Sequence, residues 1–310
     1  MEHRALGRSG TEVSRIILGC GNFGGIGSAP AFFGQGETRE QAFAIMDAAW
    51  AAGITTFDTA DAYGGGRSEA YVGDWMRSRG VRPVLTTKTF NPMSEGADSG
   101  LSGPRIQRQL EASLGRLGVE RINLYLAHQM DPATPLEETV AAFDELERAG
   151  RVGAWGGSNV DIDWIERARP AWVQNSYSLL DRDDEGLAIE LCAREGIGYT
   201  PYSPLAGGWL TGKYRRGEEP PAGSRMTMRP EPYAHLQEDG VFDALEAFER
   251  HARERETTPA ALAIAWLLAH PGVTAVVIGP RRPEQLHPAL AALEVNLSPA
   301  EREAVSALFG

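Results

Sequence analysis

Three successive strand-like segments of the chain end in residues that can donate, accept or hold a proton. Residues 54–59 are rich in β-branched and aromatic side chains, which predicts a strand that ends near Asp58. Tyr63 lies just beyond it, before a run of three glycines, and the next two apolar segments end in Lys88 and His128. Reacting groups of parallel α/β folds collect on the loops at the carboxyl ends of the strands, so this order predicts that the four side chains meet.

Taken singly, these residues have ordinary structural explanations. Asp58 can cap a turn, and Tyr63 can be a half-buried packing residue. The use of lysine argues against chance, because only Lys88 and Lys213 among the 30 basic residues are lysines. A lysine kept at the end of a buried strand indicates a role for a compact ammonium that arginine cannot fill, although biased codon usage alone could leave two lysines.

In this order and within these motifs, Asp58, Tyr63, Lys88 and His128 resemble the catalytic tetrad of the aldo-keto reductase family, in its bacterial branch related to potassium-channel β-subunits. Further motifs of the family follow along nearly the whole chain. The resemblance implies an α/β fold, a (β/α)8 TIM barrel with an N-terminal β-hairpin and long loops at its carboxyl face. It also implies NADPH-dependent reduction of aldehydes or ketones to alcohols, without a metal.

Carbonyl reduction requires a hydride donor, an acid for the developing alkoxide and a polar environment for the negative oxygen. We assign Tyr63 as the general acid, although an unperturbed tyrosine, with a pKa of about 10, is a weak acid at neutral pH. Lys88 is expected to lower that pKa, and Asp58 to keep Lys88 charged and in place. His128 is expected to donate a hydrogen bond to the substrate oxygen, or to orient it.

The resemblance also implies residues that bind the cofactor. Ser158 and Asn159 would clamp a carboxamide together with Gln174, although the first two could instead cap the following helix. Tyr202 would stack on the nicotinamide ring, and Lys213 would line the pyrophosphate channel with its neighbours. The complete expected set is Gly19, Gly21, Asn22, Asp58, Ser158, Asn159, Gln174, Tyr202, Ser203, Leu205, Lys213, Arg225, Gly279, Arg281 and Gln285.

The choice between the two nicotinamide cofactors depends on the segment 278–285. This segment resembles the family's site for the adenosine 2′-phosphate, and the guanidinium of Arg281 suits a phosphate dianion, which favours NADPH over NADH. The match ends at Pro288 and Ala289, where relatives commonly carry a Glu-Asn pair. The adenine contacts and the strength of cofactor discrimination therefore stay open.

Strands alternate with helices along the chain, and eight such units predict a parallel sheet closed into a barrel, as one domain over residues 1–310. A G-x-G-x-x-G run at 19–24 does not indicate a Rossmann fold, because the glycines and proline that follow cannot open a helix. The hairpin is expected at 4–6 and 12–14, plugging the bottom of the barrel. The expected strands are 16–18, 54–59, 83–88, 122–128, 152–157, 172–176, 197–202 and 275–278, and the expected helices are 37–52, 68–79, 103–117, 135–149, 161–168, 183–195 and two or more within 240–270.

Composition limits the function classes. The net charge of −12 opposes binding to nucleic acid or anionic lipid. The two cysteines, Cys20 and Cys192, are too few for a disulfide framework and show no metal-ligand spacing. No apolar signal or membrane-spanning run is visible, so we expect a cytoplasmic protein. The resemblance implies a small carbonyl compound as its partner. A homo-oligomer is left open.

Two other functions stay open at this point. One is a nucleotide-binding barrel that acts as a redox sensor or regulatory subunit with weak turnover, against which the complete tetrad argues. The other is an unrelated barrel lyase or isomerase, which would make all the motifs coincidences. Substrate choice depends on the loops 20–36, 90–100 and 209–240, whose aromatic residues indicate either an apolar pocket or core packing: Phe23, Phe32, Phe33, Phe90 and Trp209.

Overall fold

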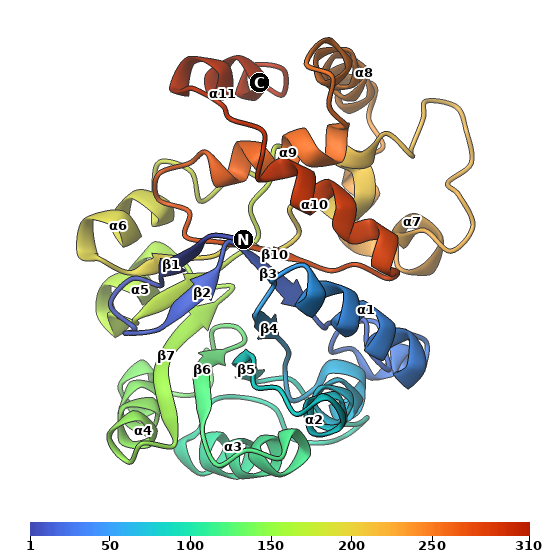
Figure 1. Cartoon of the computed structure of the whole chain (residues 1–310). Helices are drawn as coiled ribbons and strands as arrows, with labels where there is room; N and C mark the ends of the chain where they lie inside the picture. Colours follow the sequence, from blue (N-terminus) through green and yellow to red (C-terminus); the bar gives the residue numbers. More distant parts are fainter.

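The structure is a computed structural model that describes residues 1–310. Its centre is a parallel sheet of eight strands in the order β10-β3-β4-β5-β6-β7-β8-β9, with helices arranged around its outer face (Figure 1). The strands are β3 (Ile16–Gly19), β4 (Thr56–Asp58), β5 (Val84–Thr89), β6 (Ile122–Ala127), β7 (Val152–Ser158), β8 (Trp172–Gln174), β9 (Gly198–Tyr199) and β10 (Val276–Ile278). All eight expected strands are therefore present.

The sheet curls until its two edges meet. Chain order and sheet order agree from β3 to β9, and β10 returns to pair with β3. At the other side of β10, the amide of Thr274 donates to the carbonyl of Tyr199 at 2.8 Å, and that of Val277 donates to Pro201 at 2.9 Å. These bonds bring β9 alongside β10, an arrangement consistent with the expected barrel.

The helices follow from apolar spacing and end signals. In α3 the buried residues Ile106, Leu110 and Leu114 recur at helical spacing, and the helix ends at Gly118 with φ of 69°. In α1 the side chains of Thr38 and Gln41 cap each other's backbone amides. The helices that correspond to expectation are α1 (Arg39–Ala51), α2 (Arg67–Arg79), α3 (Gly103–Leu117), α4 (Leu136–Arg148), α5 (Ile162–Ala168), α6 (Ala188–Glu195), α8 (Asp239–Glu254) and α9 (Pro259–Leu268).

Some element bounds differ from the sequence-based prediction. Helix α6 begins at Ala188, not at residue 183, because Asp184 and Glu185 use their side chains on Tyr199 and Tyr177 instead. The strands expected at 54–59, 172–176 and 197–202 are each shorter and span 56–58, 172–174 and 198–199. Several short elements had no expected counterpart: η1 (Pro30–Phe32), η2 (Tyr63–Gly66), η3 (Ala206–Thr211), α7 (Arg225–Met228), η4 (Glu231–Leu236), η5 (Pro283–Leu286), α10 (His287–Ala292) and α11 (Pro299–Ser306).

The expected N-terminal hairpin is present and covers the amino-terminal end of the sheet. Strands β1 (His3–Ala5) and β2 (Glu12–Ser14) pair antiparallel. Leu6 and Val13 are fully buried in a cluster with residues of the parallel sheet, such as Leu124 and Val277. The turn approaches β9 so closely that a Cβ on Gly7 would lie 2.1 Å from the backbone nitrogen of Gly198.

The segment after β3 forms a loop and not a helix, so the rejection of the dinucleotide fingerprint is confirmed. Only the short η1 lies between β3 and α1, which begins at Arg39. Gly36 passes so close to the first turn of this loop that a Cβ there would lie 2.0 Å from the carbonyl oxygen of Asn22. This close approach fixes the next residue, Glu37, beside Asn22. None of the helices has the length and apolar character needed to cross a bilayer.

Candidate active site

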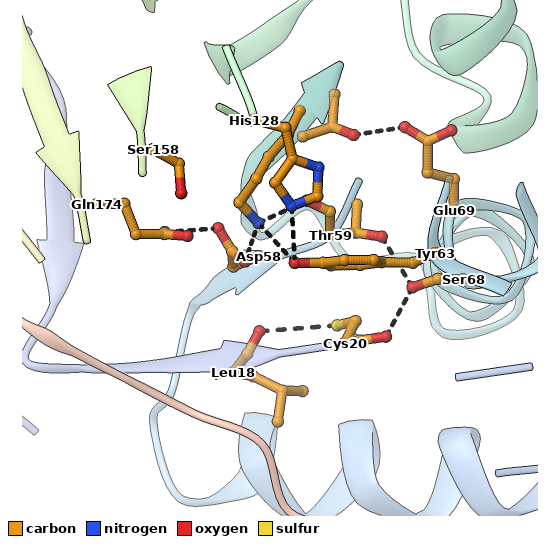
Figure 2. A network of polar contacts seen from close by, with 12 residues as sticks. Leu18, Cys20, Asp58, Thr59, Tyr63, Ser68, Glu69, His128, Ser158 and Gln174 are labelled. Atoms are coloured by element: carbon orange, nitrogen blue, oxygen red, sulfur yellow. Dashed lines mark hydrogen bonds and ion pairs between the residues drawn. The ribbon is translucent and has the colours of Figure 1, made fainter. Parts of the chain in front are cut away.

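Asp58, Lys88 and His128 lie at the carboxyl ends of three adjacent strands. Asp58 is the last residue of β4, Lys88 is next to last in β5, and His128 directly follows β6. Because these strands are parallel and paired in register, their ends lie at one edge of the sheet. Figure 2 shows Asp58, Tyr63 and His128 turned toward one another at this edge.

Tyr63 reaches the same point from the loop after β4. It begins η2, where Gly64 has φ of 58° and packs against the first loop, so that a Cβ there would lie 2.7 Å from the backbone of Gly24. Ser68, at the start of α2, donates to the carbonyl of Cys20 at 2.9 Å and fixes this loop against β3 (Figure 2). The tyrosine is therefore held by backbone packing on both sides.

The four expected catalytic residues form one connected cluster. Nζ of Lys88 donates to Oδ1 of Asp58 at 2.5 Å, to the carbonyl of Thr59 at 3.0 Å and to the hydroxyl of Tyr63 at 3.3 Å. The same hydroxyl lies 3.4 Å from Nε2 of His128. The hydroxyl of Tyr63 thus faces an ammonium and an imidazole at once.

Amide side chains orient this cluster from outside. Nε2 of Gln174 donates to Oδ2 of Asp58 at 2.9 Å, so both carboxylate oxygens are occupied. Nδ2 of Asn91 lies 3.2 Å from Nδ1 of His128, and Asn159 donates to the backbone carbonyl of His128 at 2.8 Å. Asn91 was not among the residues predicted from the sequence.

The electrostatics of the cluster correct one expectation. Lys88 lowers the pKa of Tyr63, as expected, but burial raises it by more, so the net shift is upward and not downward. Burial alone would lower the pKa of Lys88, but the carboxylate of Asp58 and the phenol of Tyr63 together raise it. Lys88 is therefore an ammonium at neutral pH, next to a phenol that keeps its proton.

His128 is neutral in this environment. Burial, followed by the charge of Lys88, holds its pKa well below the ordinary value. With the amide of Asn91 donating to Nδ1, the single ring proton is on Nε2. The imidazole can therefore donate a hydrogen bond toward an oxygen placed near the tyrosine hydroxyl.

Eight of the residues expected to bind the cofactor line one cavity of about 860 Å³: Asn22, Ser203, Leu205, Lys213, Arg225, Gly279, Arg281 and Gln285. They come from loops that are far apart in the sequence, so their common lining is a property of the fold. Another cavity, of about 960 Å³, is lined by residues such as Leu179, His270 and Phe309 and shares no residue with the cluster or with this one.

The other expected cofactor residues lie near the catalytic cluster. Gly19 pairs with Asp58 in the sheet, and a Cβ on Gly21 would lie 3.5 Å from the ring of Tyr63. Ser158 ends β7 and Asn159 follows it, accepting a hydrogen bond of 2.5 Å from the hydroxyl of Tyr202. Gln174 also faces the cluster, where its amide donates to Asp58.

The cavity has the donors that a dinucleotide requires. Lys213 and Arg225 form no ion pair with any acidic side chain, and Arg225 donates only to Oδ1 of Asn22, at 3.2 Å. Oγ of Ser224 is buried without a partner in the same wall. Gly208, with φ of 99°, leaves the wall open beside Lys213. These groups fit the pyrophosphate of a nicotinamide dinucleotide.

Burial shows which aromatic residues of the loops around the site belong to the core. Phe23 and Trp209 are fully buried core residues, whereas Phe32, Phe33 and Phe90 are half-buried. Glu37, Asn91 and Ser224 are site residues that the sequence reasoning missed. Neither periodicity nor a short motif marks them, because each is brought to the site by a loop.

Comparison with known proteins identifies the family of the chain. The model of the aldo/keto reductase family matches residues 15–309. An uncharacterized oxidoreductase of Bacillus subtilis, YrpG, is 37% identical over 96% of this chain and 92% of its own. The NADH-specific methylglyoxal reductase of Escherichia coli is 32% identical over 97% and 96%. A rice protein named as a probable voltage-gated potassium channel subunit beta is 33% identical over 95% and 92%. The chain belongs to the aldo/keto reductase family.

Proposed function

We propose that this chain, as a single (β/α)8 barrel domain, reduces aldehydes or ketones to alcohols. The observation that carries the proposal is the position of the Tyr63 hydroxyl, 3.3 Å from Nζ of Lys88 and 3.4 Å from Nε2 of His128. A nicotinamide dinucleotide held in the adjoining cavity would supply the hydride. A carbonyl oxygen near the hydroxyl would then meet an acid and a hydrogen-bond donor together.

The side chains have separate roles in this reaction. Tyr63 gives its proton to the carbonyl oxygen as negative charge develops there. Lys88 stabilises the phenolate that remains, and Asp58 keeps the ammonium charged and directed toward Tyr63. The Nε2 proton of His128 forms a hydrogen bond with the substrate oxygen, which lowers the energy of the developing alkoxide.

The raised pKa of Tyr63 is compatible with this role. A phenol that keeps its proton at neutral pH has that proton available whenever a substrate arrives. The contribution of Lys88 comes when the proton leaves, because only then is there a phenolate for the ammonium to stabilise. The pair therefore acts on the transition state more than on the resting site.

The proposed cofactor is NADPH. Support comes from Arg281, which lies on the wall of the cavity with Gln285 in the segment that resembles a 2′-phosphate site. The relative from E. coli is named NADH-specific, so both cofactors belong in any test. The proposed setting is the reducing cytoplasm, a location that the two unpaired buried cysteines support.

A regulatory role is the second candidate, because three relatives are named as putative or probable channel β-subunits. Such a protein would bind the dinucleotide and turn over slowly. The test is oxidation of NADPH, and separately NADH, by the purified chain with methylglyoxal or 4-nitrobenzaldehyde. Rapid turnover supports the reductase, tight binding without turnover favours the regulatory role, and absence of binding contradicts both.

A further inference from the structure

Arg281, the expected partner of a 2′-phosphate, is already engaged by a carboxylate. Its Nε lies 2.5 Å from Oε1 of Glu37, while Nη1 donates to the carbonyl of Gly223 at 2.8 Å and contacts Sδ of Met228. Glu37 is only 3% exposed and lines the same cavity. A phosphate that reached this guanidinium would meet a buried negative charge beside it.

The carboxylate of Glu37 is fixed in the cavity wall. Its backbone amide donates to the carbonyl of Asn22 at 2.8 Å, and its own carbonyl accepts from Gly24 at 2.9 Å. Oε2 of Glu37 is buried and has no hydrogen-bond partner. Burial raises the pKa of this carboxyl even though Arg281 opposes the effect. Apart from Arg281, no side-chain or backbone donor therefore shares the negative charge of this carboxylate.

The other cationic side chains of the cavity have no acidic partner. Lys213, Arg225 and Arg282 line it, and none of them forms an ion pair, whereas Arg281 does. The free cations match the charges of a pyrophosphate. The cation assigned to the additional 2′-phosphate is the one whose charge is already neutralised by Glu37.

We infer that Glu37 is a specificity-determining residue. It lowers the ratio of NADPH affinity to NADH affinity in this cavity. The inference depends on the proposed function only in that the cavity holds a nicotinamide dinucleotide. A 2′-phosphate must share Arg281 with the buried carboxylate and is repelled by it. A 2′-hydroxyl carries no charge and avoids this repulsion. NADH is therefore expected to bind within about tenfold of NADPH.

A purely structural role for Glu37 predicts the opposite change in cofactor affinity. If Glu37 only positioned Arg281 for a phosphate, its loss would weaken NADPH and leave NADH alone. If Glu37 opposes the phosphate, Glu37→Gln removes the repulsion, keeps the shape of the side chain and frees Arg281. NADPH would then bind more tightly, and NADH would bind equally well or less well.

The test measures dissociation constants of NADPH and NADH by titration calorimetry on the full-length chain. Glu37→Gln is expected to raise the ratio of NADPH to NADH affinity at least about tenfold. Glu294→Gln removes a charge from an exposed position outside this cavity and is expected to leave that ratio unchanged. A thermal melt of each variant shows whether it is folded.

The wild-type chain supplies an independent measurement if Glu37→Gln does not fold. Adenosine 2′,5′-bisphosphate is expected to bind less than about tenfold more tightly than 5′-AMP. A preference of a hundredfold or more, or an affinity ratio that is unchanged or lowered in folded Glu37→Gln, overturns the inference alone. Failure of all four nucleotides to bind overturns it together with the proposed function.

Discussion

The ammonium of Lys88 lies 2.5 Å from Oδ1 of Asp58, and both side chains are almost completely buried. A buried ion pair contributes little net stability, because removing two charges from water offsets most of their attraction. Its value here is positional: Gln174 occupies the other carboxylate oxygen, and the ammonium is left facing the hydroxyl of Tyr63. The pair therefore holds a positive charge where the proposed chemistry produces a phenolate.

Breaking this pair on one side is expected to destabilise the fold. In Lys88→Met the carboxylate of Asp58 stays buried without its partner, which costs about 3–5 kcal/mol. The double variant Asp58→Leu/Lys88→Met removes both charges and is expected to recover most of that loss. Urea denaturation of the wild type and both variants measures these differences. A single variant as stable as the double one would show that the pair does not behave as a buried ion pair.

His128 is expected to stay neutral across the working pH range. Its pKa is held well below the ordinary value by burial and by Lys88, so the pH profile of kcat/KM should show no histidine ionisation near neutrality. In the unfolded chain a histidine titrates at about pH 6.5. Below that pH the unfolded state binds a proton that the folded site does not bind. The free energy of unfolding therefore falls as the pH drops.

His128→Gln is the matched control for this acid effect, since glutamine keeps an N–H donor and does not titrate. The variant should lose less stability than the wild type between neutral and mildly acidic pH. An NMR titration in which the imidazole of His128 protonates close to its ordinary pKa would contradict the account of a neutral donor.

Asp61 should give the opposite pH dependence. Its carboxyl is fully buried, and burial together with Glu69 raises its pKa to about 7, although Thr89 and Arg105 act in the opposite direction. An unfolded aspartate titrates near about 3.9. Between these values the folded state holds the proton and the unfolded state does not, so this group's contribution to stability falls as the pH rises, until about pH 7.

Asp61→Asn removes the titrating group and is expected to be more stable than the wild type at pH values above 7, by up to about 4 kcal/mol. The exposed Glu95→Gln serves as control and should change little. Thermal or urea denaturation at several pH values measures the difference. Equal stability of Asp61→Asn and the wild type at alkaline pH would show that the carboxyl has a partner in solution.

Asn91 is expected to act through His128. Its amide faces Nδ1, so Asn91→Leu frees the imidazole to rotate or change tautomer. Loss of one oriented hydrogen bond corresponds to a fall of about tenfold in kcat/KM. In the His128→Gln background the same substitution should have no further effect. Additive losses in the two variants would mean that Asn91 acts elsewhere.

Much of the catalytic cluster could be predicted from the sequence because a parallel sheet fixes where strand ends lie. Asp58, Lys88 and His128 each close an apolar run, and register alone brings them to one edge. The contact of Glu37 with Arg281 joins positions 244 residues apart through two loops. Its existence depends on the close approach of Gly36 to Asn22, which no periodicity encodes.

The direction of the shift in the pKa of Tyr63 also could not be predicted from the sequence. The charge of Lys88 could be predicted to lower it, but the opposing effect of burial depends on how the glycine loop packs against Gly24. Similarly, α6 begins at Ala188 because Asp184 and Glu185 find partners on β9 and nearby loops. The helix propensity of residues 183–195 does not reveal those partners.

The most direct test of the account is single-turnover reduction of a carbonyl substrate by Tyr63→Phe, compared with the wild type at saturating cofactor. The substitution removes only the hydroxyl that contacts Lys88 and His128. The account predicts that the cofactor binds within about threefold of wild-type affinity. It also predicts a rate of hydride transfer lower by at least about a hundredfold. A variant that binds cofactor and reduces the carbonyl at the wild-type rate would contradict the assignment of Tyr63 as the acid.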